Sequence, residues 1–411
     1  MRMNKRDKMA LVPKLRFPEF KNNGEINFEN GNVIFESISN KNHNSDLPVL
    51  AITQEHGAIP RAQIDYNVSV TDKSLESYKV VEIGDFIISL RSFQGGIEYS
   101  LYHGICSPAY IILRKKKPIV EQYYKHYFKT NKFIQDLNKD LEGIRDGKMV
   151  SYGQFSSILL PKPENKEQQK IADCLSSLDD LITAEDKKLE ILKAHKKGLM
   201  QKLFPAEGVT APEWRFPEFK GSREWESKTI GRACISFSGG TPDTSNKAYY
   251  NGSIPFIRSG EINKNTTELF ITQEGFDNSA AKMVRTGDVL FALYGANSGE
   301  VSLSKIEGAI NQAILCLQHE TNNAFLYQYL SHKKNWIIAT YIQGGQGNLS
   351  GEIVKSIELY FPQSEEQQKI AACLSSLDDR INAQVDKIET LQAHKKGLMQ
   401  GLFPSIEEVS K

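Results

Sequence analysis

The chain has 411 residues, 40% hydrophobic and 25% charged, which suffices for two or three folded domains and excludes wholesale disorder. Lysine and arginine number 51 and aspartate and glutamate 50, so bulk positive charge cannot drive nucleic-acid binding; any such contact must use local patches or partner chains. No run approaches 18 uninterrupted apolar residues, which argues against a membrane span. The five cysteines form no CxxC pair, which favours reduced thiols and a cytoplasmic location.

The first region, residues 1–164, is predicted to be a small α/β domain built on a mixed sheet. After a Gly-Asp turn at Gly84, the pattern indicates a strand, a Gly-rich hairpin loop, a second strand, a Gly turn and a third, apolar strand, followed by a helix over 120–141. An arginine suited to guanine or phosphate and a glutamine suited to adenine make the loop a candidate DNA contact, although an ordinary hairpin loop is the alternative. The candidates are Arg91, Ser92, Phe93 and Gln94.

Residues 165–205 are predicted to form one long helix. A narrow, heptad-spaced apolar stripe requires a partner helix along its whole length, and about 35 residues make a rod of about 50 Å. Asn165 and Gln168 have the spacing of a capping box at the start, as do Ser364 and Gln367, 199 residues further on. The stripe consists of Ile171, Leu175, Leu178, Ile182, Leu189, Leu192, Leu199 and Leu203. Three prolines in the following link, Phe204–Phe219, end the helix.

The second region, residues 206–363, repeats the strand and turn pattern of the first, with its Gly-Asp turn at Gly287 and a helix predicted over 323–342. Its loops differ from those of the first region, and different loops on one scaffold are expected when each domain reads a different target. Amide, hydroxyl, aromatic and cationic groups make these loops candidates for DNA contact. The candidates are Thr241, Arg258, Ser259, Tyr294 and Asn297.

Residues 364–404 are a second copy of the long helix, and residues 405–411 are a short polar tail. Of the 39 positions that pair Glu167–Pro205 with Glu366–Pro404, 29 are identical, at an offset of 199 residues. The hexapeptide RFPEFK occurs at Arg16–Lys21 and again at Arg215–Lys220, at the same offset. The chain is therefore two copies of one unit, each a variable domain followed by a nearly invariant helix.

Each helix finds its obvious partner in the other copy, so an antiparallel coiled coil with an internal pseudo-two-fold axis is predicted. Glu185 and its repeat equivalent Gln384 interrupt the apolar stripe near the helix midpoints. A polar pair there would set the register; the alternative is that both side chains reach solvent. The residues predicted to pair the helices are Leu178, Ile182, Glu185, Leu189, Leu192, Leu377, Ile381, Gln384, Ile388 and Leu391.

No catalytic constellation is recognisable in the chain. There is no GxxxxGK[ST], HExxH or GxSxG motif, no GxGxxG opening a helix after a strand, and no histidine spacing typical of a metal site. The acidic pairs Asp179–Asp180 and Asp378–Asp379 are interpreted as a solvated face or partner surface. The cationic cluster His195–Lys197, repeated at His394–Lys396, is interpreted as helix-end electrostatics, with phosphate or partner contact as the alternative. Neither catalysis nor a metal site is expected.

The sequence resembles the specificity subunits of type I restriction-modification systems over essentially its whole length. The resemblance rests on the alternation of variable domains and near-identical helices, and on the runs PENKEQQKIADCLSSLDDLI and FPQSEEQQKIAACLSSLDDRI. The second domain adds SGGTPDTSNKAYYNGSIPFIRSGEIN, a run typical of target recognition domains that the first domain lacks. The resemblance implies two target recognition domains separated by antiparallel conserved helices.

The resemblance further implies recognition of a bipartite, asymmetric site in double-stranded DNA. It implies that two modification subunits and restriction subunits bind this chain and carry S-adenosylmethionine, ATP and magnesium, so that this chain needs no cofactor. Adenine methylation and cleavage would belong to those partners. Two other hypotheses are weighed: a coiled-coil scaffold that binds only protein, which leaves the variable loops unexplained, and a stand-alone nuclease or methyltransferase, which the missing motifs oppose.

Overall fold

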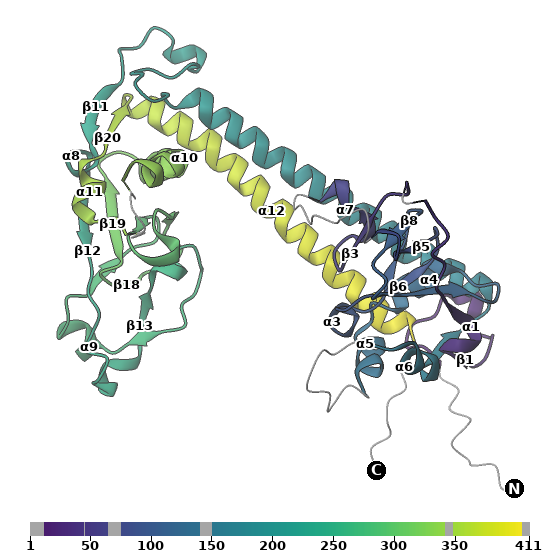
Figure 1. Ribbon diagram of the computed structural model, residues 1–411. Helices are drawn as coiled ribbons and strands as arrows, with labels where there is room; N and C mark the ends of the chain where they lie inside the picture. Colours follow the sequence, from purple (N-terminus) through teal and green to yellow (C-terminus); the bar gives the residue numbers. More distant parts are fainter. Residues whose placement is uncertain (1–11, 45, 65–74, 140–149, 342–347, 405–411) are drawn as a thin grey trace, which may run out of the picture. The chain divides into compact units, whose positions relative to one another are not determined.

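The computed structural model describes residues 12–44, 46–64, 75–139, 150–341 and 348–404. The chain divides into two compact units, one made of residues 1–185 and 387–411 and the other of residues 186–386. Two helices of 39 residues each, α7 (Asn165–Leu203) and α12 (Ser364–Leu402), contribute part of their length to each unit (Figure 1).

The main sheet of the first unit has four antiparallel strands in the order β2-β9-β6-β7. Its core is strongly aromatic, because Phe35 and Phe86 pack edge to face at 5.4 Å and Phe86 packs in the same way on Phe128 at 5.1 Å. The strands are β2 (Phe35–Ile38), β6 (Phe86–Ile88), β7 (Glu98–Tyr99) and β9 (Ile111–Lys115).

Three two-stranded antiparallel ladders complete the strand pairing of this unit. They join β1 (Asn27–Asn30) to β10 (Leu159–Lys162), β3 (Leu50–Thr53) to β4 (Gly57–Pro60), and β5 (Lys79–Val81) to β8 (Gly104–Cys106). Short helices lie between the strands. They are α1 (Gly31–Ile34), α3 (Ser92–Gly95), α4 (Glu121–Tyr127), α5 (Asn131–Asn138) and α6 (Tyr152–Ser157).

Three predictions for the first unit are corrected. The predicted mixed sheet is antiparallel in the described residues, where parallel pairing is limited to the isolated bridges Val49–Ile105 and Ala58–Ser100. The predicted third strand is two strands, β8 and β9, in different sheets, because a turn at Ser107, where Tyr110 N donates to Ser107 O, separates them. The predicted helix over 120–141 is two helices, α4 and α5, because Thr130 caps a new helix by accepting from Phe133 N. Its predicted end at Leu141 lies outside the described residues.

The second unit repeats this skeleton, and its predicted third strand is likewise two strands in different sheets, β18 (Gly308–Ile310) and β19 (Ile314–His319). Its main antiparallel sheet has the order β12-β19-β16-β17, and a second sheet, β14-β13-β18-β15, contains the parallel pair β13–β18. The strands are β11 (Glu226–Thr229), β12 (Cys234–Ser238), β13 (Tyr250–Ile257), β14 (Phe270–Ile271), β15 (Lys282–Val284), β16 (Val289–Ala292), β17 (Val301–Leu303), β18 (Gly308–Ile310), β19 (Ile314–His319) and β20 (Glu358–Phe361). The helices are α8 (Ile230–Ala233), α9 (Gln273–Asp277), α10 (Asn323–Tyr341) and α11 (Gly351–Ser356).

Both long helices take part in the core of each unit. In the first unit, Leu175 of α7 and Leu402 of α12 belong to one buried cluster with the domain's aromatic residues. In the second unit, the repeat equivalents Leu374 and Leu203 exchange these roles. The start of one helix therefore packs with the end of the other, which is antiparallel packing within each unit. The predicted fold class, a mixed α/β chain with two repeated domains and long paired helices, is confirmed.

The two repeated sequence motifs bind each other. In the first unit, the Arg16 guanidinium donates to both carboxylate oxygens of Glu167, at 2.7 and 2.8 Å. In the second unit, Arg215 donates to both oxygens of Glu366, at 2.8 and 2.5 Å. Each glutamate side chain is only 1% exposed. The RFPEFK hexapeptide is thus a clamp that ties the start of each variable domain to the first turn of its helix.

The acidic and cationic clusters of the helices also bind each other, which corrects their interpretation as separate surface features. Asp179 accepts from Lys395 in the first unit, and Asp378 accepts from Lys196 at 2.5 Å in the second. Asp378 also accepts from Gln328 of α10, at 2.6 Å. Antiparallel packing explains the pairs, because it brings the end of one helix beside the first half of the other.

The predicted capping box is wrong. Asn165 and Ser364 are already the first helical residues, and the buried amides of Gln168 and Gln367 bond elsewhere. Gln168 Nε2 donates to Pro163 O and its Oε1 accepts from Val120 N. The glutamine thus ties the helix start to the body of its domain rather than to its own cap.

The positions predicted to pair the helices are all partly or fully covered: Leu192, Leu377, Gln384 and Ile388 are buried and the other six are half-buried. Gln384 is 4% exposed, and the Glu185 carboxylate, 12% exposed, accepts from Lys387. Replacing both Glu185 and Gln384 with leucine is expected to raise the melting temperature by a few degrees, because apolar side chains fill a helix seam better than polar ones, at some cost in register specificity.

Thermal unfolding followed by circular dichroism tests this expectation. Glu190→Leu is the control, because its side chain is 72% exposed and gains no burial from the change. A double variant that melts below the parent would show that the two polar residues together stabilise the helix pair more than two leucines do.

Candidate nucleic-acid interface

The Gly-rich loop of the first unit leaves β6 and forms the single helical turn α3. Gly96 ends the turn with φ +81°, and a Cβ there would lie 2.0 Å from Phe128 O, so both the conformation and the space require glycine. The Ser92 hydroxyl accepts from Ser89 N at 2.9 Å and is buried beneath the turn. The loop is therefore a tightly folded structure.

Three separate elements anchor this loop by its backbone carbonyls. Gln54, between β3 and β4, donates to Arg91 O at 3.2 Å, and Asn138 of α5 donates to Phe93 O at 2.6 Å. Lys129, between α4 and α5, donates to Gly95 O at 3.0 Å and to the buried Glu98 carboxylate at 2.5 Å. Burial raises the pKa of Glu98 although Lys129 opposes the change. These anchors hold the loop in one conformation.

The four candidates in this loop fall into two groups. Arg91 and Gln94 are exposed, and no ion pair holds the Arg91 guanidinium among the residues that the structure describes. Ser92 is 1% exposed, and Phe93 is half-buried against the aromatic core. Their side chains build the loop, and the surface that it presents to solvent comes from Arg91 and Gln94.

The loop that follows β16 holds the same place in the second unit. Tyr294 precedes the short turn Gly295–Asn297 and is 38% exposed. Asn297 and Ser259, two predicted contacts that are distant in sequence, line one hollow of about 190 Å³. Thr241 is exposed and donates to Gln312 Oε1 at 2.7 Å. The structure therefore brings Ser259 and Asn297 together.

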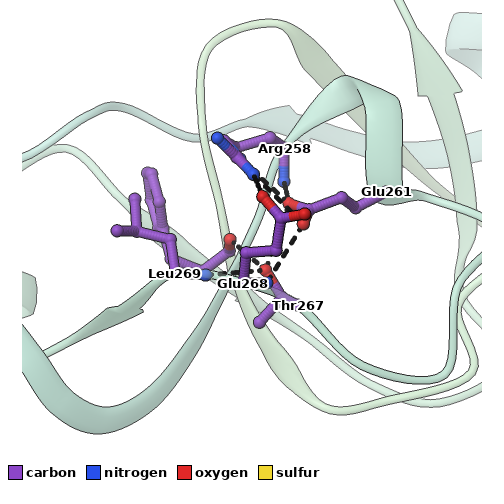
Figure 2. Close-up of polar contacts among 6 residues, drawn as sticks. Arg258, Glu261, Thr267, Glu268 and Leu269 are labelled. Carbon is purple, nitrogen blue, oxygen red and sulfur yellow. Dashed lines mark hydrogen bonds and ion pairs between the residues drawn. The ribbon is translucent and has the colours of Figure 1, made fainter. Parts of the chain in front are cut away.

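Arg258 lies in a network of two glutamates and a threonine (Figure 2). Its Nε donates to Glu261 Oε2 at 3.0 Å, and its Nη2 donates to Glu261 Oε1 at 3.2 Å and to Glu268 Oε2 at 2.7 Å. Thr267 Oγ1 donates to Glu261 Oε2 at 3.1 Å. Burial alone would raise the pKa of Glu261, but the Arg258 and Thr267 side chains and the Glu268 N–H outweigh it and lower the pKa to about 2.

Sequence reasoning missed the residues that shape these sites. Glu261 stands three residues after Arg258, a spacing that favours an ion pair on a helical turn and could have indicated the contact. Glu98, Lys129 and Glu268 carry no such local signal, because their contacts depend on loops brought together by the fold.

Across the described ranges, no three His, Cys, Asp or Glu side chains gather in a way that could hold a metal ion. In the same ranges, no helix is both long and apolar enough to cross a bilayer.

Comparison with known proteins decides the family. The sequence profile of the type I restriction modification DNA specificity domain matches twice, at residues 18–194 and 222–392. The chain belongs to the specificity subunits of type I restriction-modification systems. It is therefore a non-catalytic subunit with a role in DNA sequence recognition within a restriction-modification complex, and each match spans one variable domain and most of its helix.

Individual relatives agree with this assignment. The chain is 26% identical over 368 residues to a Methanocaldococcus jannaschii protein named as the specificity subunit of type I restriction enzyme MjaX, covering 83% of this chain and 82% of the relative. The fold is similar to the crystal structure of the type I S subunit from M. genitalium, with a TM-score of 0.61, 15% identity and coverage of 97% and 100%. It is also similar to a chain in a structure described for assembly of the type I system, with a TM-score of 0.56, 16% identity and coverage of 92% and 97%.

Proposed function

We propose that this specificity subunit recognises a bipartite, asymmetric DNA sequence, one block through each variable domain. The observation that carries the proposal is that the β6–β7 and β16–β17 connections occupy the same place in two copies of one skeleton but have different sequences, Arg91–Gly96 and Tyr294–Ser298. Different loops on one scaffold are expected of two readers with different targets. Because both readers belong to one chain, a fixed run of unread bases separates the blocks.

The proposed contacts in the first block are Arg91 and Gln94, held out by the anchored loop whose interior is Ser92 and Phe93. A rigid presentation lowers the entropy cost of binding, which supports this loop as a reader. In the second block the proposed contacts are Thr241, Arg258, Ser259, Tyr294 and Asn297.

We infer further that two modification subunits and restriction subunits assemble on this chain in the cytoplasm. The solved chain of the same fold described in terms of complex assembly supports this inference. Adenine methylation with S-adenosylmethionine, and cleavage with ATP and magnesium, belong to those partners in this proposal. The specificity subunit determines the DNA sequence at which these partners act.

DNA binding is expected to depend on these partners. Residues 25–165 contain 16 basic and 17 acidic side chains, and residues 222–364 contain 12 and 13. Both variable domains are thus near neutral, and the phosphate term that dominates non-specific binding is weak. The isolated chain should bind DNA poorly and lose that binding as salt rises, whereas the complex with modification subunits should bind one sequence specifically.

Gel-shift titrations of the full chain, with and without the modification subunit, test this at physiological salt. Specific binding that appears only with the subunit is the expected result. Tight, sequence-specific binding by the chain alone would contradict the partner dependence. A complex that assembles but prefers no sequence would instead favour the alternative of a coiled-coil scaffold without DNA specificity.

A further inference from the structure

We propose that Arg258 and Glu268 together read one G·C base pair in the second block, with Glu268 accepting from the cytosine amino group. The inference rests on the proposed function of the second domain and assigns a base to two named side chains. It adds Glu268, which the sequence patterns did not single out, to the recognition surface.

The charges of the network argue against a phosphate contact. Arg258 brings one positive charge, and Glu261 and Glu268 bring two negative charges, so the cluster is negative overall. Two carboxylates around one guanidinium would repel a phosphate group rather than attract it. If this surface meets DNA, base edges are the groups that it can accept.

Stability does not explain Glu268. Glu261 is buried and already makes a two-point contact with the guanidinium, which neutralises its charge and fixes its plane. The Glu268 side chain is 75% exposed and adds one more contact to an arginine that is itself 45% exposed. Exposed pairs of this kind contribute little to stability. The Glu268 carboxylate therefore adds little to the stability that Glu261 already gives to the position of Arg258.

The Arg258–Glu268 pair has one unused donor group and one unused acceptor oxygen. Arg258 uses Nε and Nη2 for its two glutamates, and no acceptor for Nη1 is found in the described part of the chain. Glu268 uses Oε2 as acceptor, and within the same ranges no donor reaches its Oε1. The Arg258 Nη1 group and the Glu268 Oε1 atom therefore belong to two exposed side chains that a hydrogen bond holds together, and Figure 2 shows these two side chains meeting.

A G·C pair offers partners for both of these groups in the major groove. Guanine presents the acceptors O6 and N7, which arginine binds, and cytosine presents the N4 amino donor, which a glutamate can accept. Thymine O4 in place of the amino group would face the carboxylate with a second acceptor. Glu261 acts as the positioning residue, because its contact with Nε and Nη2 leaves Nη1 to point elsewhere.

Glu268→Gln is the test, because it removes the charge while keeping size and shape. The control is Glu307→Gln, the same change at an exposed glutamate of the same unit that belongs to no network in the described residues. The full chain is expressed with its modification subunits, and the methylated motif is determined by sequencing. The assembled complex is then titrated with four duplexes that differ only at the assigned base pair.

The parent is expected to require G·C at one position of the second block. Glu268→Gln should lower discrimination at that position about tenfold and leave the first block unchanged, whereas Glu307→Gln should change neither block. An unchanged motif, or an equal change in affinity for all four duplexes, would overturn the inference. A parent complex that methylates no defined sequence would instead overturn the proposed function, so the two failures are distinguishable.

Discussion

Replacing Arg215 with methionine is expected to lower the free energy of unfolding of the second unit by about 3–5 kcal/mol. The side chain of Glu366 is 1% exposed and both its oxygens accept from Arg215, so the variant leaves a carboxylate buried without its counter-charge. Removing one partner of a buried pair costs far more than the pair itself contributes. The clamp also joins the domain to its helix, so the loss should affect the whole unit.

Urea unfolding followed by tryptophan fluorescence measures this effect in the second unit. The three tryptophans of the chain, at positions 214, 225 and 336, all belong to the second unit. Lys220→Met, at the exposed end of the same hexapeptide, is the control and should change stability by no more than about 0.5 kcal/mol.

The double variant Arg215→Met with Glu366→Leu distinguishes the effect of an unpaired buried carboxylate from the effect of lost side-chain packing. It should recover most of the lost stability, because two apolar side chains of similar volume replace an ion pair at little net cost. A single variant as stable as the parent would show that the clamp does not hold the unit together.

Much of the fold could be predicted from the sequence, because the chain contains two copies of one unit and the same pattern can be seen in both. The predicted helices over 165–205 and 364–404 correspond closely to α7 and α12. The first two strands after each Gly-Asp turn followed from apolar runs and glycines, whereas the predicted third strand is two strands in each unit. The break between α4 and α5 was missed although Thr130 is a good N-cap, because the apolar pattern continues across it.

The contacts between elements could not be predicted in the same way. The shared offset of RFPEFK and the helix shows that both recur, but the bond between Arg215 and Glu366 spans 151 residues and requires the fold. The same distinction applies to the candidate interface. Glycines marked the loops, whereas the burial of Ser92 and the pairing of Arg258 with Glu268 depend on how neighbouring loops pack.

Exchanging the second variable domain is expected to replace one half of the recognised sequence and nothing else. The change covers residues 222–364, which follow the link and end at the first residue of α12, and substitutes the corresponding domain of another specificity subunit. The skeletons of the two domains in this chain match in strand order while their loops differ, so the scaffold should accept a new set of loops. The helices and the first domain, which carry the other contacts, stay as they are.

Sequencing of methylated adenine in a host that expresses the exchanged chain with its modification subunits is the most direct test of two independent readers. The expected result is a new second block, with the first block and the number of unread bases between them unchanged. A change in both blocks together, or a change in the spacing alone, would contradict the assignment of one block to each domain.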